Sequence, residues 1–247
     1  MRRLLCVTAH PDDEAGGFGG SLLRYRLSGV ETYVICLTPG QAATNRGGTA
    51  SGKELAAMRR KEFAVSCELL KITCGEVLDY PDGGLDRVDY RAVVAGLTVR
   101  MRKIRPQVVL TFGPEGAITG HTDHAMASLF ATMAFHSAPR TDRFPEQLSD
   151  GVAPHRPQKL YYATALFTLP DRQPVALAPA TAIIDIAEHV ETKIAAFRAH
   201  TSQSPIFPRF EAAVRARGQS EFFHLAATST PRKMENETDL FAGVTED

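Results

Sequence analysis

One stretch near the start of the chain, LLCVTAHPDDE at residues 4–14, decides its fold. The run from Leu4 to Ala9 is apolar or strand-compatible and ends in a proline turn, which is typical of a buried strand rather than a helix. His10 therefore follows the carboxyl end of a strand. In an open α/β sheet, ligands bind at that edge because the loops diverge there and leave a crevice. The stretch predicts a ligand site in the first loop.

This first loop concentrates charge that resists burial. One imidazole and three carboxylates stand within five residues, from His10 to Glu14. The carboxylates repel one another and lose hydration on burial unless a cation or many hydrogen-bond donors compensate. A bound metal ion is the simplest explanation of the pattern.

A second cluster, GHTDH at residues 120–124, follows another strand-like run at 108–112. Two strands of one parallel sheet would bring both clusters to the same edge. Two imidazoles and one carboxylate with an open fourth position form a standard catalytic zinc shell, and here those ligands would be His10, Asp13 and His124. Iron(II), cobalt and manganese also suit such ligands.

Predicted strands and helices alternate along the rest of the chain. Further strands are expected at 31–38, 76–80, 159–165 and 181–186, and helices at 18–28, 53–70, 90–104, 123–135, 187–200 and 209–217. This alternation predicts an α/β fold, a Rossmann-like, mostly parallel sheet flanked by helices on both faces. We expect one catalytic domain over 1–230 and a polar C-terminal tail over 231–247 that frays.

The glycines at 16, 17, 19 and 20 suggest a dinucleotide-binding loop, but Leu22 stands where G-x-G-x-x-G requires the third glycine. The acidic residues beside them would also repel a pyrophosphate. We expect these glycines instead to allow a tight loop and close packing of the next helix on the sheet.

The bulk composition points to a small substrate of little charge. The 247 residues carry 28 Lys and Arg against 28 Asp and Glu, so no overall field attracts nucleic acid or an anionic membrane. The apolar stretch after Arg3 is too short for a signal peptide or a membrane span, so we expect a cytoplasmic protein. The four cysteines form no C-x-x-C pair and suit a reduced interior.

The two motifs together resemble the LmbE/PIG-L family of zinc-dependent de-N-acetylases. AHPDDE at 9–14 and HTDH at 121–124 carry the resemblance, and weaker similarities extend it to roughly residues 3–205. The resemblance implies Zn²⁺ as cofactor and an N-acetylglucosamine-type sugar or conjugate as substrate. Because relatives are often oligomeric, it also suggests a homo-oligomer.

Roles for the neighbours of the ligands follow from the resemblance together with local geometry. Adjacent residues in a turn point apart, so Asp12 could face the bound water as general base while Asp13 ligates; the alternative for Asp12 is a helix cap. His121 is the candidate to stabilise the oxyanion, with Asp123 orienting a neighbouring imidazole. A third metal ligand and a helix-start residue are the alternatives for His121.

Two more residues match family positions that look like contacts to substrate hydroxyl groups. They are Arg59, which could equally be a solvated helix residue, and Asp82, which could be a turn former. Thr122 stands where the family usually has proline, and Thr119 replaces a tyrosine found in some relatives. Neither position belongs to the predicted metal shell.

The sequence therefore predicts a metal-dependent hydrolase that removes an N-acetyl group from an N-acetylglucosamine-type sugar or conjugate with a metal-activated water. An amidase acting on a thiol conjugate or another acyl amide is an alternative, because the same shell would hydrolyse any amide that fits. A non-catalytic, metal-dependent sugar-binding protein is a third reading, against which Asp12 argues as a carboxylate that a passive site does not need.

Overall fold

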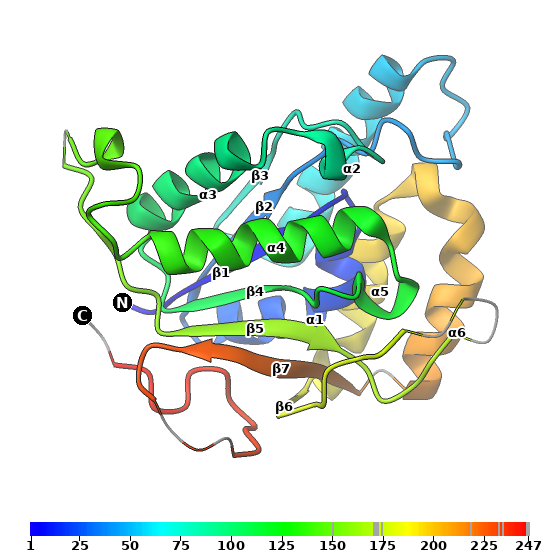
Figure 1. Ribbon diagram of the computed structural model, residues 1–247. Coiled ribbons are helices and arrows are strands. Elements are labelled where there is room, and N and C mark those ends of the chain that lie inside the picture. Colours follow the sequence, from blue (N-terminus) through cyan, green and yellow to red (C-terminus); the bar gives the residue numbers. More distant parts are fainter. Residues whose placement is uncertain are drawn as a thin grey trace.

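A seven-stranded sheet runs through the part of the chain described by the computed structural model, in the order β3-β2-β1-β4-β5-β7-β6 (Figure 1). The described residues are 1–149, 151–169, 173, 175–217, 219–231, 233 and 235–245. The strands are β1 Arg3–Thr8, β2 Glu31–Cys36, β3 Cys74–Val77, β4 Val108–Phe112, β5 Lys159–Thr164, β6 Ala182–Asp185 and β7 Ser220–Thr228.

Strand β1 is an inner strand of the sheet and pairs in parallel with β2 on one side and β4 on the other. β3 and β5 extend the parallel part outward, whereas β7 runs antiparallel to both β5 and β6. Residues 4–7 of β1 have no exposed surface. A strand covered on both faces is expected to be apolar along its whole length, which explains the uninterrupted run Leu4-Leu5-Cys6-Val7.

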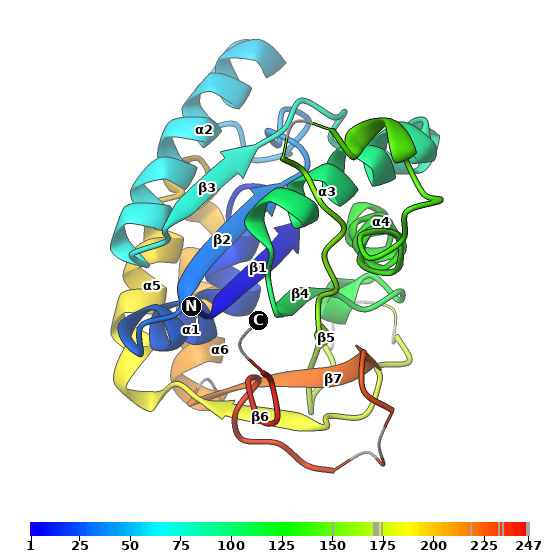
Figure 2. The same cartoon turned by 90° about the vertical axis from the view of Figure 1, so that its left-hand side faces the viewer.

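Helices cover both faces of this sheet. They are α1 Asp13–Leu27, α2 Gly52–Leu69, α3 Tyr90–Ile104, α4 Thr122–Ser137, α5 Val190–Arg198 and α6 Phe207–Arg217. Figure 2 shows α3 and α4 on one face and α1, α2, α5 and α6 on the other. The predicted fold, a Rossmann-like and mostly parallel sheet between two helical layers, is confirmed.

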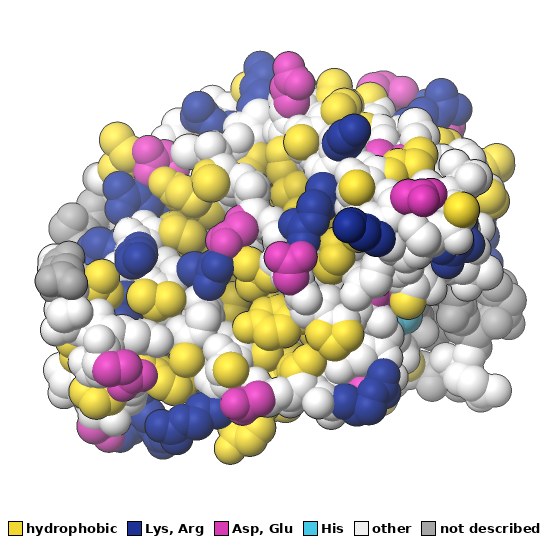
Figure 3. Space-filling view, turned by 90° about the horizontal axis from the view of Figure 1, so that it is seen from above, with side chains coloured by type: hydrophobic (Ala, Val, Ile, Leu, Met, Phe, Trp, Pro, Cys, Tyr) yellow, Lys and Arg dark blue, Asp and Glu magenta, His cyan; other side chains and the backbone are white. Residues whose placement is uncertain are grey.

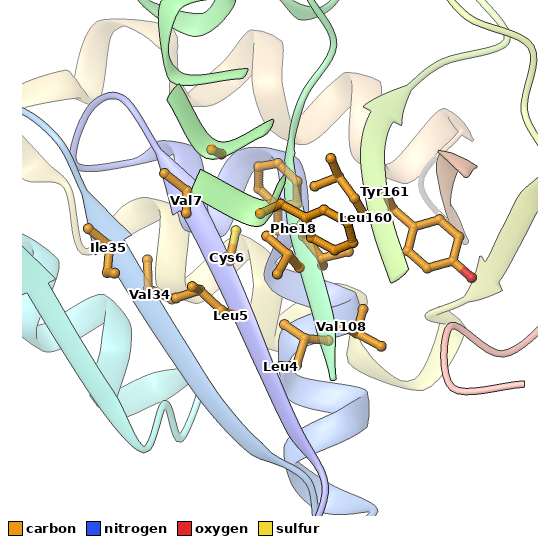
Figure 4. Packing of buried hydrophobic residues seen from close by; sticks show 14 of the residues in the cluster. Leu4, Leu5, Cys6, Val7, Phe18, Val34, Ile35, Val108, Leu160 and Tyr161 are labelled. Atoms are coloured by element: carbon orange, nitrogen blue, oxygen red, sulfur yellow. The ribbon is translucent and has the colours of Figure 1, made fainter. Parts of the chain in front are cut away.

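The core forms where the central strands meet α1 (Figure 4). The ring of Phe18 on α1 packs against Phe112 of β4 at 5.4 Å between centroids and against Phe223 of β7 at 6.3 Å. Full burial of an aromatic or aliphatic side chain of this size contributes about 1.5–3 kcal/mol. This packing fixes α1, and with it the loop that precedes α1, on the sheet.

The glycine-rich segment is helical rather than a loop, which corrects our expectation of a helix starting at residue 18. Helix α1 begins at Asp13, directly after the first loop. A Cβ atom added to Gly20 would lie 2.4 Å from Cδ1 of Ile186, so this glycine lets α1 approach the segment after β6. Close packing, the second of the two predicted roles for these glycines, is the one observed at Gly20.

Strand β7 is absent from the sequence-based expectations. Its inward-facing residues Glu221, Phe223 and Leu225 are buried, and they alternate with less buried neighbours. One of the inward positions is a carboxylate, which breaks the apolar alternation that signals a strand. Glu221 is tolerated because Lys193 Nζ donates to it at 2.5 Å and the N–H groups of Gly20 and Ser21 donate to it as well.

Part of the segment expected to fray is packed on the domain. Glu237 forms an isolated parallel bridge with Ala182 of β6, and Leu240 and Phe241 are buried. The expected fraying does not hold for 237–244, because the apolar side chains there reach the core beside Tyr25. Residues 232, 234, 246 and 247 of this segment lie outside the described residues.

The surface agrees with the balanced composition. On the face shown in Figure 3, basic and acidic side chains are interspersed with apolar ones and neither sign forms a continuous field. Among the described helices, none combines the length and the apolar character needed to cross a bilayer.

Candidate metal centre and active site

The two motifs lie side by side at one edge of the sheet. β1 and β4 are parallel neighbours, with Leu5 opposite Val109, so the loops that follow them leave the sheet together (Figure 1). The ring centroid of His10 lies 4.9 Å from that of His121 and 5.3 Å from that of His124. Residues far apart in the sequence thus form one cluster at the carboxyl ends of the strands.

Asp13 lies between two of the imidazoles. Its Oδ1 is 3.1 Å from Nε2 of His124, and its Oδ2 is 3.5 Å from Nδ1 of His10. Oδ2 also accepts hydrogen bonds from the N–H groups of Ala9 and His10. Burial raises the pKa of the Asp13 carboxyl, but His124 and His10 lower it further, so this pKa lies well below its usual range. Asp13 is therefore an anion held by two imidazoles.

The opposite side of the His10 ring meets two other carboxylates. Nε2 of His10 is 3.1 Å from Oδ1 of Asp82 and 3.2 Å from Oδ2 of Asp123. Burial lowers the pKa of His10, but Asp123, Asp13 and Asp82 outweigh it and raise this pKa well above its usual value. A carboxylate on one ring nitrogen orients a histidine to ligate a metal through the other, which here is Nδ1.

Asp123 is itself anchored by backbone donors from another loop. Its two carboxylate oxygens accept the N–H groups of Gly83 at 2.7 Å and Leu85 at 3.1 Å. Asp82 accepts the N–H of Ala42 at 2.8 Å. The carboxylates that hold the His10 ring are thus fixed by the backbone of Ala42, Gly83 and Leu85. The predicted role of Asp123 did not include this support.

The donor set fits a divalent cation. One ligand atom from each of His10, His121 and His124 lies within 4.8 Å of the others, and the same holds for His10, Asp82 and Asp123. Within the part of the chain that the structure describes, Arg59 is the one guanidinium that forms an ion pair with a carboxylate of this cluster, that of Asp12. A cation would supply the missing positive charge, and imidazole with carboxylate suits zinc or iron(II).

His124 is held by contacts that the sequence did not indicate. The ring of Phe112 stacks on it at 4.1 Å between centroids with 10° between the planes. Nδ1 of His124 lies 3.4 Å from Oγ1 of Thr119. These contacts leave Nε2 of His124 directed at Asp13, as a metal ligand would require. Phe112 is the last residue of β4, and Thr119 lies in the connection between β4 and α4.

His121 stands at the N-terminus of α4 and its side chain caps the helix. Nδ1 of His121 accepts the N–H of Asp123 at 3.1 Å. This hydrogen bond requires an unprotonated Nδ1, so the neutral ring carries its proton on Nε2. Burial and the neighbouring imidazoles of His10 and His124 lower the pKa of His121, which favours the neutral ring. His121 therefore combines a helix-start position with an Nε2–H group that can donate a hydrogen bond.

Asp12 stands beside the ligands in an unusual backbone conformation. Its φ is 118° and ψ −26°, and although it precedes α1, its side chain makes no capping hydrogen bond. Oδ2 of Asp12 is 3.1 Å from Nη2 of Arg59. Burial raises the pKa of Asp12 to about 6, although the Arg59 guanidinium acts in the opposite direction. The side chain retains 16% of its exposure, so it is accessible from the site.

Arg59 and Asp82 lie in the same cluster and not in the solvent. Arg59 is 3% exposed and donates to the carbonyl oxygens of Pro11 and Gly40 as well as to Asp12. Arg59 is therefore not a solvated helix residue, and Asp82 does more than form a turn, because its carboxylate contacts His10 and Ala42. Both side chains hold the loops of the site in place.

The fold is an open α/β sheet, and histidine and carboxylate ligand atoms lie at the carboxyl ends of β1 and β4, where such sheets bind ligands. The protein is therefore an α/β protein with a candidate metal centre at this edge. The chain belongs to the PIG-L family, whose model, described as GlcNAc-PI de-N-acetylase, matches residues 5–135.

Three relatives illustrate the likeness. The chain is 32% identical over 208 residues to a diacetylchitobiose deacetylase of Thermococcus kodakarensis, covering 83% of this chain and 71% of that protein. It is 28% identical over 298 residues to 1D-myo-inositol 2-acetamido-2-deoxy-alpha-D-glucopyranoside deacetylase 2 of Catenulispora acidiphila, covering 98% and 97%. A solved N,N'-diacetylchitobiose deacetylase from Pyrococcus horikoshii, complexed with its inhibitor MPG, superposes with a TM-score of 0.76 at 26% identity, covering 91% and 83%.

Proposed function

We propose that this protein is a metal-dependent hydrolase that removes the N-acetyl group from an N-acetylglucosamine-type sugar or conjugate. The observation that carries the proposal is the position of Asp13 between His10 and His124, with the Asp12 carboxylate adjoining it. Deacetylases of acetylated amino sugars among the relatives support the same reaction.

His10, Asp13 and His124 would hold the ion, for which we propose Zn²⁺, with Fe²⁺ as the alternative. A divalent ion bound there would polarise a carbonyl oxygen and would lower the pKa of a bound water to about 7. Asp12 accepts the proton of the attacking water and later returns it to the leaving nitrogen, so the products are acetate and a free amine.

His121 and Asp123 assist this chemistry in different ways. Nε2–H of His121 donates a hydrogen bond to the acetyl oxygen as negative charge develops on it. Asp123 holds the His10 ring so that Nδ1 faces the ligand position. Contacts of Arg59 and Asp82 with substrate hydroxyl groups stay a prediction, as do the cytoplasmic location and the homo-oligomer.

The test is acetate release by purified protein from a panel of N-acetylglucosamine derivatives, comprising the free sugar, its β-linked disaccharide and its inositol glycoside. Release that stops on chelation and returns with Zn²⁺ would support the proposal. Metal-replete protein that releases no acetate from any member contradicts it. Release of another acyl group would indicate the amidase, and binding without hydrolysis the sugar-binding protein.

Asp12→Asn separates chemistry from metal binding. We expect it to lower kcat by about 10²–10⁴-fold, the usual contribution of a general base, with bound metal unchanged. Metal content is measured on the same preparation by mass spectrometry. A variant with normal turnover would remove Asp12 from the mechanism.

A further inference from the structure

Glu14 lies directly behind the first loop and is completely buried. Its Oε1 accepts hydrogen bonds from Oγ of Ser66 on α2 at 2.6 Å and from Nε2 of His200 at 2.7 Å. Its Oε2 accepts the backbone N–H of Asp12 at 3.0 Å. Ser66 and His200 are also completely buried, so water does not compete for these hydrogen bonds.

The backbone of Asp12 needs such support. With φ at 118°, this residue adopts a strained conformation that residues other than glycine rarely take. Such conformations persist only where the surroundings determine them. Here the N–H of Asp12 is taken by Glu14, and its carbonyl accepts the N–H of Gly16 at 2.8 Å in the first turn of α1. These two hydrogen bonds fix the peptide groups on either side of the Asp12 side chain.

We propose that Glu14 is a positioning residue that, supported by Ser66 and His200, holds the backbone of Asp12 so that its carboxylate faces the reaction site. The inference rests on the proposed hydrolase function, in which Asp12 is the general base. Both carboxylate oxygens of Glu14 are engaged by protein donors, so Glu14 is not a metal ligand.

A carboxylate suits this position because it only accepts hydrogen bonds, and three donors converge on it. The donors belong to three segments that the fold brings together: the first loop, α2 and the residues after α5. Because α2 and His200 fix the Glu14 carboxylate, and Glu14 binds the Asp12 N–H, the positions of α2 and His200 determine the orientation of Asp12.

Glu62 provides a matched control on α2, the helix that also carries Ser66. It is also buried, and its carboxylate accepts hydrogen bonds from the N–H of Ser202 at 2.6 Å and the hydroxyl groups of Ser202 and Thr201 at 2.7 Å each. It thus binds the same 200–202 segment, but it makes none of the hydrogen bonds to Asp12 in the described structure.

The experiment compares Glu14→Leu, Glu14→Gln and Glu62→Leu in the metal-loaded protein. Glu14→Leu removes the acceptor for the Asp12 N–H, and we expect kcat to fall about 100-fold with KM and metal content unchanged, as for a misplaced catalytic group. Glu14→Gln keeps an acceptor for the Asp12 N–H in its amide oxygen, while the Ser66 hydroxyl and a neutral His200 ring can accept from its amide nitrogen, so this variant should recover most of kcat. Glu62→Leu should lower the melting temperature and leave kcat unchanged.

Two outcomes would overturn the inference. One is a kcat of Glu14→Leu equal to that of Glu62→Leu, which would make Glu14 a structural residue only. The other is a Glu14→Gln variant as impaired as Glu14→Leu, which would mean that the charge of Glu14, and not its hydrogen bond, is what matters.

A measurement without substrate separates this inference from the proposed function. Exchange of the Asp12 amide hydrogen, followed by NMR, should be slow in the wild type and in Glu62→Leu, and fast in Glu14→Leu. Absence of acetate release from the wild type would refute the proposed reaction but leave this result interpretable. Equal exchange of the amide in all variants would refute the role of Glu14, whatever the substrate, and it can be measured even if Glu14→Leu is less stable.

Discussion

Oδ1 of Asp13 lies 3.1 Å from Nε2 of His124, although the first residue begins α1 and the second stands in the first turn of α4. The contact joins the two helices that follow the paired strands β1 and β4. A metal site built across this contact depends on both strand–helix connections. Substituting the residues that hold these connections in place therefore tests the site as directly as substituting the ligands.

Asp123→Asn should weaken metal binding without unfolding the protein. The substitution keeps the shape of the side chain but removes the negative charge beside Nε2 of His10, and loss of such a carboxylate typically lowers metal affinity 10–100-fold. Competition with a chelator of known affinity measures the change. Unaltered affinity would mean that His10 does not need Asp123 for ligation.

His121→Ala distinguishes the remaining roles of that histidine. If its Nε2–H donates to the acetyl oxygen, kcat should fall about 10²–10³-fold while the protein keeps its metal. A third metal ligand would instead show itself by loss of the ion. Because His121 also caps α4, the melting temperature is measured in parallel, and a cap of this kind contributes about 1 kcal/mol.

Gly20→Ala should destabilise the protein even though alanine is the better helix former. The added Cβ would meet Ile186, and overpacking of this kind costs about 1–3 kcal/mol. Gly17→Ala is the control, because its Cβ would meet only Phe112 at 3.9 Å, an ordinary contact. Urea denaturation should show Gly17→Ala to be neutral or stabilised by up to about 1 kcal/mol. Equal effects of the two substitutions would contradict close packing at Gly20.

Glu237→Ala tests whether the C-terminal segment contributes to stability. Glu237 receives hydrogen bonds from Lys159 Nζ at 2.7 Å and from the hydroxyl of Tyr161, all in a buried position. Removing one partner of a buried ion pair destabilises a protein by about 3–5 kcal/mol. In chemical denaturation, adding Lys159→Met to Glu237→Ala should recover much of that loss. A single variant as stable as the wild type would show that the segment is dispensable.

Much of the secondary structure could be predicted from local pattern. The expected ranges 90–104 and 108–112 coincide with α3 and β4, since each shows one clear period bounded by a proline or a cap. The start of α1 was missed because its glycines are poor helix formers, and packing of Phe18 and Gly20 outweighs that propensity. β7 was missed because Glu221 interrupts its inward face.

In the candidate site, too, some residues could be predicted from the sequence and others could not. Ligand chemistry is a property of residue type, so histidine and aspartate after two strand-like runs were enough to select His10, Asp13 and His124 as candidates. Arg59 was singled out as well, but its burial against Pro11 and Gly40 follows from the approach of α2 to the first loop. The stacking of Phe112 on His124 likewise depends on how α4 leaves the sheet.

By itself, the sequence predicted most of the strands and helices, a mostly parallel sheet that gathers two polar loops at one edge, and ligand types in those loops that suit a divalent cation. Periodicity and residue type are local properties, and they are legible in a single chain. Only the tertiary structure decided which donors reach Glu14, which carboxylates hold His10, and that β7 enters between β5 and β6. Those contacts join segments far apart in the chain, and their geometry arises from packing of the whole core, which no local pattern encodes.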